Sequence, residues 1–172
     1  MSDLQSLAKH KAAAEMQRRI AALPSAIEAI NREHAAKGLL LSGATLKRVL
    51  AACRIATEAQ CDTVIAEYRW AINHALFASQ SWVERLLVEA IQSLEPLHAE
   101  AAKHFQTACV LVGKPELAAR LLSDLEPTET AAANDIALAL RSCFAERRRG
   151  LVRSIPSLLT RLLFRIFGGG AA

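Results

Sequence analysis

Residues 44–94 read ATLKRVLAACRIATEAQCDTVIAEYRWAINHALFASQSWVERLLVEAIQSL and contain neither proline nor glycine. Nothing in this stretch interrupts an α-helix, and a continuous helix over it would be about 75 Å long. A single helix of that length cannot bury its own apolar face. It must therefore fold back once, most easily at the polar segment 73–81, or lie along partner helices.

Apolar residues in this stretch recur every three or four positions, as they do on one face of an α-helix. Ile65, Tyr68 and Ile72 form a stripe, which Leu76 and Val83 widen. A stripe this broad is typical of a helix bundle, whereas a two-stranded coiled coil has a narrower seam. The sequence therefore predicts that both halves of the stretch pack in a bundle.

Glycine and proline are scarce and lie mainly at the edges of the other periodic segments, which predicts an all-α protein. We expect an elongated helical bundle of six or seven helices, built on one long central helix or on a helical hairpin made from it. The remaining helices are predicted at residues 3–23 and 25–37, which are one kinked helix if Pro24 does not break it, and at residues 97–112, 116–125, 128–147 and 151–167.

The charged residues are divided unevenly between the body of the chain and its end. All 17 acidic residues lie before residue 147, whereas the last 26 residues contain six arginines and no acid. The net charge of +4 therefore originates in the C-terminal segment. We predict two parts: a bundle domain at residues 1–149, and a basic amphipathic helix with a flexible GGGAA end at residues 150–172.

The segment 151–167, LVRSIPSLLTRLLFRIF, has the pattern of a helix that lies at a membrane interface. On a helical wheel, its arginines and hydroxyl residues form a narrow polar face, and large apolar residues cover the rest. Such a helix inserts its apolar side chains while its arginines reach anionic headgroups. The candidate surface-binding residues are Arg147, Arg148, Arg149, Arg153, Leu158, Leu159, Arg161, Leu162, Leu163, Phe164, Arg165 and Phe167.

Other functions fit the same segment. It could be the last core helix of the bundle, with its arginines in solvent, or it could occupy a groove of a partner protein. The Arg147–Arg149 cluster could instead belong to an adaptor that binds nucleic acid. Against nucleic acid, the cluster is followed by leucines and phenylalanines, and the body of the chain is slightly acidic.

The sequence contains no convincing catalytic or metal-binding pattern. Glu95 and His98 form one Glu-x-x-His pair, but a di-metal site in a bundle needs two such pairs and further glutamates. No two of the four cysteines form a Cys-x-x-Cys pair, and we expect them to be reduced and mostly buried. His74 is expected to be a polar bundle residue. We therefore expect a protein that is not an enzyme and needs no cofactor or metal.

Residues 99–122, AEAAKHFQTACVLVGKPELAARLL, resemble phasins, the helical proteins that coat polyhydroxyalkanoate granules. In that family an Ala- and Gln-rich helix meets a short turn of the Asp/Ser-Pro-Gln-Glu-Leu kind, followed by another helix. Residues 113–117, GKPEL, take the place of that turn, with the glutamine missing and lysine replacing the acid or serine. The resemblance implies a non-catalytic coat protein that self-associates on a hydrophobic surface, and hence a homo-oligomer.

The N-terminal residues contain an early aspartate and no apolar run of the signal-peptide kind. No window of 18 apolar residues occurs in the chain. We therefore expect a cytoplasmic protein that is peripheral on a membrane or granule.

Overall fold

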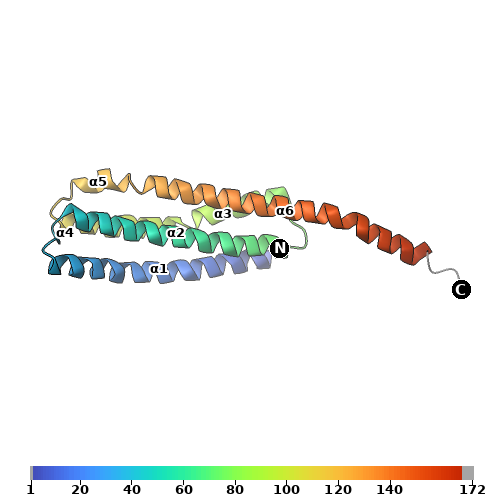
Figure 1. Cartoon of the computed structure of the whole chain (residues 1–172), viewed down its shortest axis with the longest axis horizontal. Helices are drawn as coiled ribbons and strands as arrows, with labels where there is room; N and C mark the ends of the chain where they lie inside the picture. The colour runs from blue at the N-terminus through green and yellow to red at the C-terminus, as the bar shows by residue number, and fades with distance from the viewer. Residues whose placement is uncertain (1, 168–172) are drawn as a thin grey trace.

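Six α-helices make up the described chain, and they are packed as a bundle (Figure 1). The computed structural model describes the backbone of residues 2–167 and the side chains of residues 3–149. No strand occurs within that part, so the predicted all-α bundle is confirmed. The GGGAA end lies outside the described residues. The helices are α1 (Ser2–Ala36), α2 (Gly43–His74), α3 (Gln80–Gln92), α4 (Glu95–Leu111), α5 (Leu117–Leu122) and α6 (Glu126–Phe167).

The helices form long rods that lie side by side (Figure 1). α1 runs away from the N-terminus, α2 returns beside it, and α3 and α4 together form a third rod with a bend at residues 93–94. After the short α5, α6 runs parallel to α2. We call the end where α1 begins and α2 finishes the tail end, and the end that holds the α1–α2 connection the opposite end.

The long central stretch folds back at residues 75–79, inside the polar segment where the sequence predicted a turn. α2 ends at His74, and α3 begins at Gln80. The Ser79 hydroxyl accepts a hydrogen bond from the Trp82 backbone N–H at 3.2 Å, which caps the start of α3. The central element is therefore a helical hairpin and not one continuous rod.

Glycines at two predicted helix ends adopt the left-handed conformation that ends a helix. Gly38 has φ +68° and Gly113 has φ +74°. After Gly38, the Leu39 N–H donates to the His34 carbonyl at 2.8 Å, and after Gly113, the Lys114 N–H donates to the Cys109 carbonyl at 2.9 Å. These bonds satisfy carbonyls at the ends of α1 and α4. Both predicted stops are confirmed.

Pro24 lies inside α1, so residues 3–23 and 25–37 belong to one helix, which is one of the two alternatives that the sequence left open. A proline removes one backbone hydrogen bond and strains the preceding turn, but it does not always end a helix. Leu23 and Ile27, on either side of it, are both buried in the core. Their packing holds the two halves of α1 in one rod.

The two helices predicted at residues 128–147 and 151–167 are one helix, α6, which passes through Gly150 and Pro156. Glycine within a helix costs only about 1 kcal/mol relative to alanine, which is too little to end a helix by itself. α6 begins at Glu126, so Pro127 belongs to its first turn, where the missing N–H costs nothing. α5 is also shorter than the helix predicted at residues 116–125.

The core consists of two apolar clusters that follow one another along the bundle. The cluster at the tail end lies between α1, α2, α3 and α6, and the cluster at the opposite end lies mainly between α1, α2 and α4. Buried polar side chains of α2 occupy the level between them, notably Thr57 and Gln60. The largest fully buried side chains are Tyr68, Phe105, Ile72, Leu86, Leu94, Leu97, Ile136, Leu140 and Gln60.

Gln60 is fully buried and is hydrogen-bonded to α1 through both ends of its amide. Its Nε2 donates to the Ala12 carbonyl at 3.0 Å, and its Oε1 accepts from Arg19 Nε at 3.0 Å. Arg19 Nη2 also donates to the Thr63 hydroxyl at 2.8 Å. Sliding α1 along α2 would break these bonds and leave polar groups unsatisfied. Gln60 therefore fixes the alignment of the two helices.

We predict that Gln60→Ala lowers the free energy of unfolding by about 1–3 kcal/mol, because Arg19 loses a buried acceptor. Gln106→Ala, on the exposed side of α4, is the matched control and should change stability by less than about 0.5 kcal/mol. Urea unfolding followed by circular dichroism measures both. Equal stability of the two variants would contradict the assigned role of Gln60.

Candidate surface-association site

α6 is longer than the part of it that packs in the bundle (Figure 1). Its parallel packing on α2 is fixed at two levels: Cys61 Sγ donates to the Ala132 carbonyl at 3.5 Å, and Cys143 Sγ donates to Asn73 Oδ1 at 3.3 Å. α2 ends at His74. The backbone of α6 continues to Phe167, about 30 Å past the level of Arg147 at 1.5 Å per residue.

Arg147 joins α6 to the last turn of α2. Its guanidinium donates to the backbone carbonyls of Ile72 and Ala75. Carbonyls at the end of a helix lack intrahelical partners and carry partial negative charge, so a cation there is stabilising. Arg147 is half-buried by this contact. Arg147 therefore stabilises the packing of α6 on α2. The exposed charges of the arginine cluster are those of Arg148 and Arg149.

Arg148 and Arg149 are both exposed. The Arg148 guanidinium lies 6.0 Å from the centroid of the Phe144 ring, at the outer limit of a cation–π contact. Neither arginine forms a salt bridge of 4 Å or less with a described carboxylate. Both charges are consequently available at the point where α6 leaves the bundle.

The other sequence-predicted surface residues belong to the part of α6 whose side chains are not described. The backbone there is helical through Phe167, so the predicted helical periodicity applies. Which way their side chains point stays a prediction. These residues are Arg153, Leu158, Leu159, Arg161, Leu162, Leu163, Phe164, Arg165 and Phe167.

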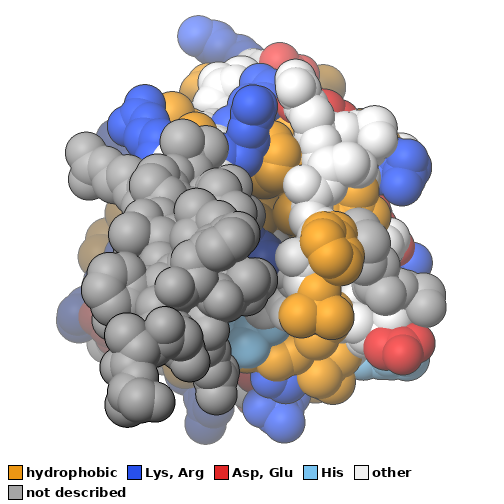
Figure 2. All heavy atoms as spheres, turned by 90° about the vertical axis from the view of Figure 1, so that its right-hand side faces the viewer, with side chains coloured by type: hydrophobic (Ala, Val, Ile, Leu, Met, Phe, Trp, Pro, Cys, Tyr) orange, Lys and Arg blue, Asp and Glu red, His pale blue; other side chains and the backbone are white. Residues whose placement is uncertain are grey.

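An exposed apolar loop at the tail end was missed by the sequence reasoning. Leu76 and Phe77, in the connection between α2 and α3, are 86% and 82% exposed. The prediction that Leu76 widens the buried stripe is wrong, because α2 ends at His74 and the helical periodicity stops there. Figure 2 looks onto this end, where hydrophobic side chains are exposed among lysine, arginine, acidic and other polar side chains.

The last two turns of α2 and one lysine of α1 place further aromatic and basic side chains at the tail end. The Trp70 and His74 rings stack with their centroids 4.8 Å apart, and Lys11 Nζ lies 4.9 Å from the Trp70 ring centroid. His74 is a polar residue of the bundle, as the sequence predicted, and it is exposed in the last turn of α2. The tail end thus combines apolar, aromatic and cationic groups.

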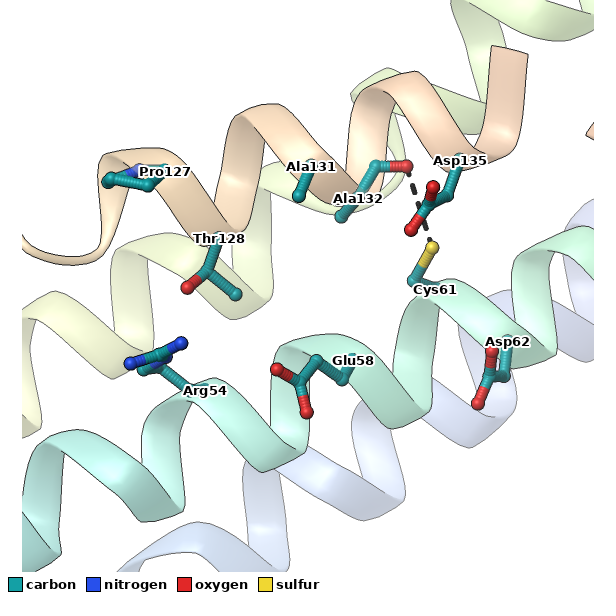
Figure 3. A pocket seen from close by; sticks show the side chains of 9 residues that line it. All are labelled: Arg54, Glu58, Cys61, Asp62, Pro127, Thr128, Ala131, Ala132 and Asp135. Carbon is teal, nitrogen blue, oxygen red and sulfur yellow. Dashed lines mark hydrogen bonds between the residues drawn. The ribbon is translucent and has the colours of Figure 1, made fainter. Parts of the chain in front are cut away.

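A cavity of about 380 Å³ lies between α2 and the start of α6 (Figure 3). Arg54, Glu58 and Asp62 line it from α2, and Thr128 and Asp135 line it from α6. Three carboxylates and one guanidinium make it an acidic, open hollow. No group of three or more metal-ligating side chains was found among the described residues.

The thiol in this cavity is a poor nucleophile. Burial, together with the smaller effects of the nearby Asp135 and Asp62 carboxylates, raises the pKa of Cys61 to about 11. The thiol is therefore protonated at neutral pH, and the thiolate is the reactive form. All four cysteines are free and buried, as the sequence predicted.

His98 lies between α4 and the start of α6. Its Nδ1 is 3.7 Å from Glu129 Oε1, while its Nε2 is buried and has no hydrogen-bond partner. Burial holds the pKa of His98 below its ordinary value, although Glu129 and Glu95 oppose this shift. His98 is therefore a titratable contact within the bundle, and its pairing with Glu129 across two helices was not visible in the Glu95-x-x-His98 pattern.

In the part of the chain that the structure describes, none of the helices combines the length and the apolar character needed to cross a membrane. Comparisons with protein-family models, with curated proteins and with solved structures gave no match to this chain.

We predict that Arg147→Ala lowers the free energy of unfolding by about 1–2 kcal/mol, because the end of α2 loses its cationic cap. The neighbouring Arg148→Ala removes the same charge without that contact and should cost less than about 0.5 kcal/mol. Urea unfolding compares the two. A similar loss in both variants would contradict the capping role of Arg147.

Stability should also depend on pH through His98. Because the pKa of His98 is lower in the folded protein than its ordinary 6.5, the unfolded chain binds the proton first as the pH falls. The free energy of unfolding should therefore decrease below about pH 6.5 until the lower folded pKa is passed. Urea unfolding between about pH 7 and 5 measures this slope.

His98→Gln should flatten that slope, whereas His10→Gln, at an exposed position of α1, should leave it unchanged. The slope of the free energy of unfolding against pH reports proton binding, whereas its absolute value also changes when a substitution alters packing. Comparing the slopes therefore isolates the effect of titration. An unchanged slope in the His98 variant would refute this origin of the pH dependence.

Proposed function

We propose that this chain is a non-catalytic helical scaffold or coat protein that associates with a lipid or granule surface through the C-terminal part of α6. In this account the bundle is the rigid body, and the residues after Arg149 are the attachment element. The resemblance of residues 99–122 to phasins agrees with such a role, and with self-association of the protein on the surface.

The single observation that carries the proposal is the length of α6 beyond its partner rods. α2 ends level with Arg147, and α6 continues to Phe167. The sequence of this extension has a wide apolar face and only arginine as its charged residue type. Leaving large apolar side chains in water is unfavourable by about 25 cal/mol per Å². A hydrophobic surface that also offers anionic groups satisfies both faces of the helix.

The chemistry of the body supports a non-catalytic role. Burial raises the pKa of Cys53 and of Cys61 to about 11, so neither is a reactive thiolate at neutral pH. The described cavities open between helices and carry ordinary surface ion pairs such as Lys9–Glu89. These features of the bundle agree with a structural role and do not indicate a reaction site.

Binding to nucleic acid is the second candidate, because Arg148 and Arg149 are exposed next to one another. The two proposals differ in their response to salt. Phosphate contacts release counterions, so nucleic-acid affinity falls steeply as the salt concentration rises. Insertion of leucines and phenylalanines into an apolar phase is much less sensitive to salt.

We predict that the full chain co-sediments with phosphatidylserine-containing vesicles or with polyhydroxyalkanoate granules. A truncation after Arg149, and the full chain with Leu158→Ser and Leu162→Ser, should both lose this binding. Arg148→Gln with Arg149→Gln should reduce it less, because each basic residue near an anionic surface contributes only about 1 kcal/mol.

Equal sedimentation of the full chain and the truncation would overturn the surface proposal. DNA binding that is retained on truncation, is lost in the double arginine variant, and falls steeply with salt would favour the second candidate instead.

A further inference from the structure

The most exposed large apolar side chains among the described residues are Leu76 and Phe77. They are adjacent in one short connection, at the same end of the bundle from which α6 extends. Single apolar residues on a surface are normal, but two neighbouring ones at a loop tip indicate a contact with an apolar partner. Reversal of the chain between α2 and α3 does not by itself require two large apolar residues at the loop tip.

The backbone on both sides of the loop is held firmly. Ala75 is buried, and its carbonyl accepts a hydrogen bond from Arg147. On the other side, Ser79 caps α3 and the Trp82 side chain is buried. Because the residues on both sides of the loop are held in place, Leu76 and Phe77 stay at its exposed tip and do not pack onto the bundle core.

The same end of the bundle is basic. Arg148 and Arg149 are exposed and directly follow Arg147, which contacts the end of α2, and His74 directly precedes the loop. Nearby acidic residues include Glu84 and Glu146, but Glu84 is paired with Arg141 at 3.0 Å. Apolar side chains flanked by cations match the chemistry of an anionic membrane, which offers an acyl layer beneath negative headgroups.

We propose that Leu76 and Phe77 are a second membrane-insertion point, so that the bundle docks end-on to an anionic lipid bilayer through this loop as well as through α6. The inference rests on the proposed function and adds a specific partner and a specific orientation to it. Leu76 and Phe77 enter the acyl boundary, and Arg148 and Arg149 contact lipid phosphates beside them. Because α6 extends about 30 Å past the level of this loop, α6 bends after Arg149 when both meet one bilayer, and the long axis of the bundle then stands away from the membrane.

The test measures partitioning of the full chain onto phosphatidylcholine vesicles with and without phosphatidylserine. Leu76→Ser with Phe77→Ser should weaken binding about ten-fold, which corresponds to about 1.4 kcal/mol. The matched control is Leu41→Ser with Val110→Ser, which removes two residues of 68% and 65% exposure at the opposite end of the bundle. The control should bind like the unaltered chain, and circular dichroism verifies that all variants are folded.

A direct readout comes from Phe77→Trp in the full chain. The unaltered chain contains Trp70 and Trp82, and its fluorescence is the reference. The additional emission from position 77 should shift to shorter wavelength on phosphatidylserine vesicles, and brominated lipid should quench it. An added signal that lipid does not quench would overturn insertion of the loop.

The outcomes separate the two proposals. If the loop variant binds as well as the unaltered chain while the Leu158 and Leu162 variant does not, the loop inference fails and the proposed function stands. If the full chain does not bind phosphatidylserine vesicles at all, both fail for lipid membranes. If the loop variant instead changes the oligomeric state in the absence of vesicles, the loop is a contact between copies and the membrane assignment is wrong.

Discussion

Burial of α2 on several faces is the constraint on which the rest of the structure depends. Val64, Tyr68 and Ile72 are completely buried, and they meet α1, α3 and α6 around them. An amphipathic helix becomes stable by burying its apolar face against neighbours. The other rods are therefore aligned along α2, and where α2 ends, the bundle ends. α6 is the one described helix that continues well past this level (Figure 1).

The unusual surface features of the molecule gather where α2 stops. The exposed pair Leu76 and Phe77, the stacked Trp70 and His74, and the cap formed by Arg147 all lie at this end. The opposite end is closed by glycine-terminated turns at Gly38 and Gly113. The two ends of the bundle therefore differ in their surface chemistry. A coat or scaffold protein with such ends can attach to a surface by the tail end and expose the opposite end to solvent.

Much of the fold could be predicted from local sequence, because its signals are local. The polar segment around Ser79 and the two helix-ending glycines act within a few residues, and they are where the sequence placed them. Gly150 misled the prediction, because one glycine costs a helix only about 1 kcal/mol, whereas the effect of Pro24 was left open because a proline can either kink or end a helix. The roles of Arg147 and Leu76 depend on where α6 meets α2 in space, a long-range pairing that no local pattern encodes.

We propose that α6 has two parts with different partners: a part that packs on α2, and a part after Arg149 that meets an external surface. Hydrogen–deuterium exchange of the full chain, with and without phosphatidylserine vesicles, tests it most directly. We predict that backbone amides of residues 151–167 gain protection when vesicles are added, while amides of residues 132–147 are protected equally in both conditions. Protection of residues 151–167 that is already complete in the monomer without vesicles would contradict the account.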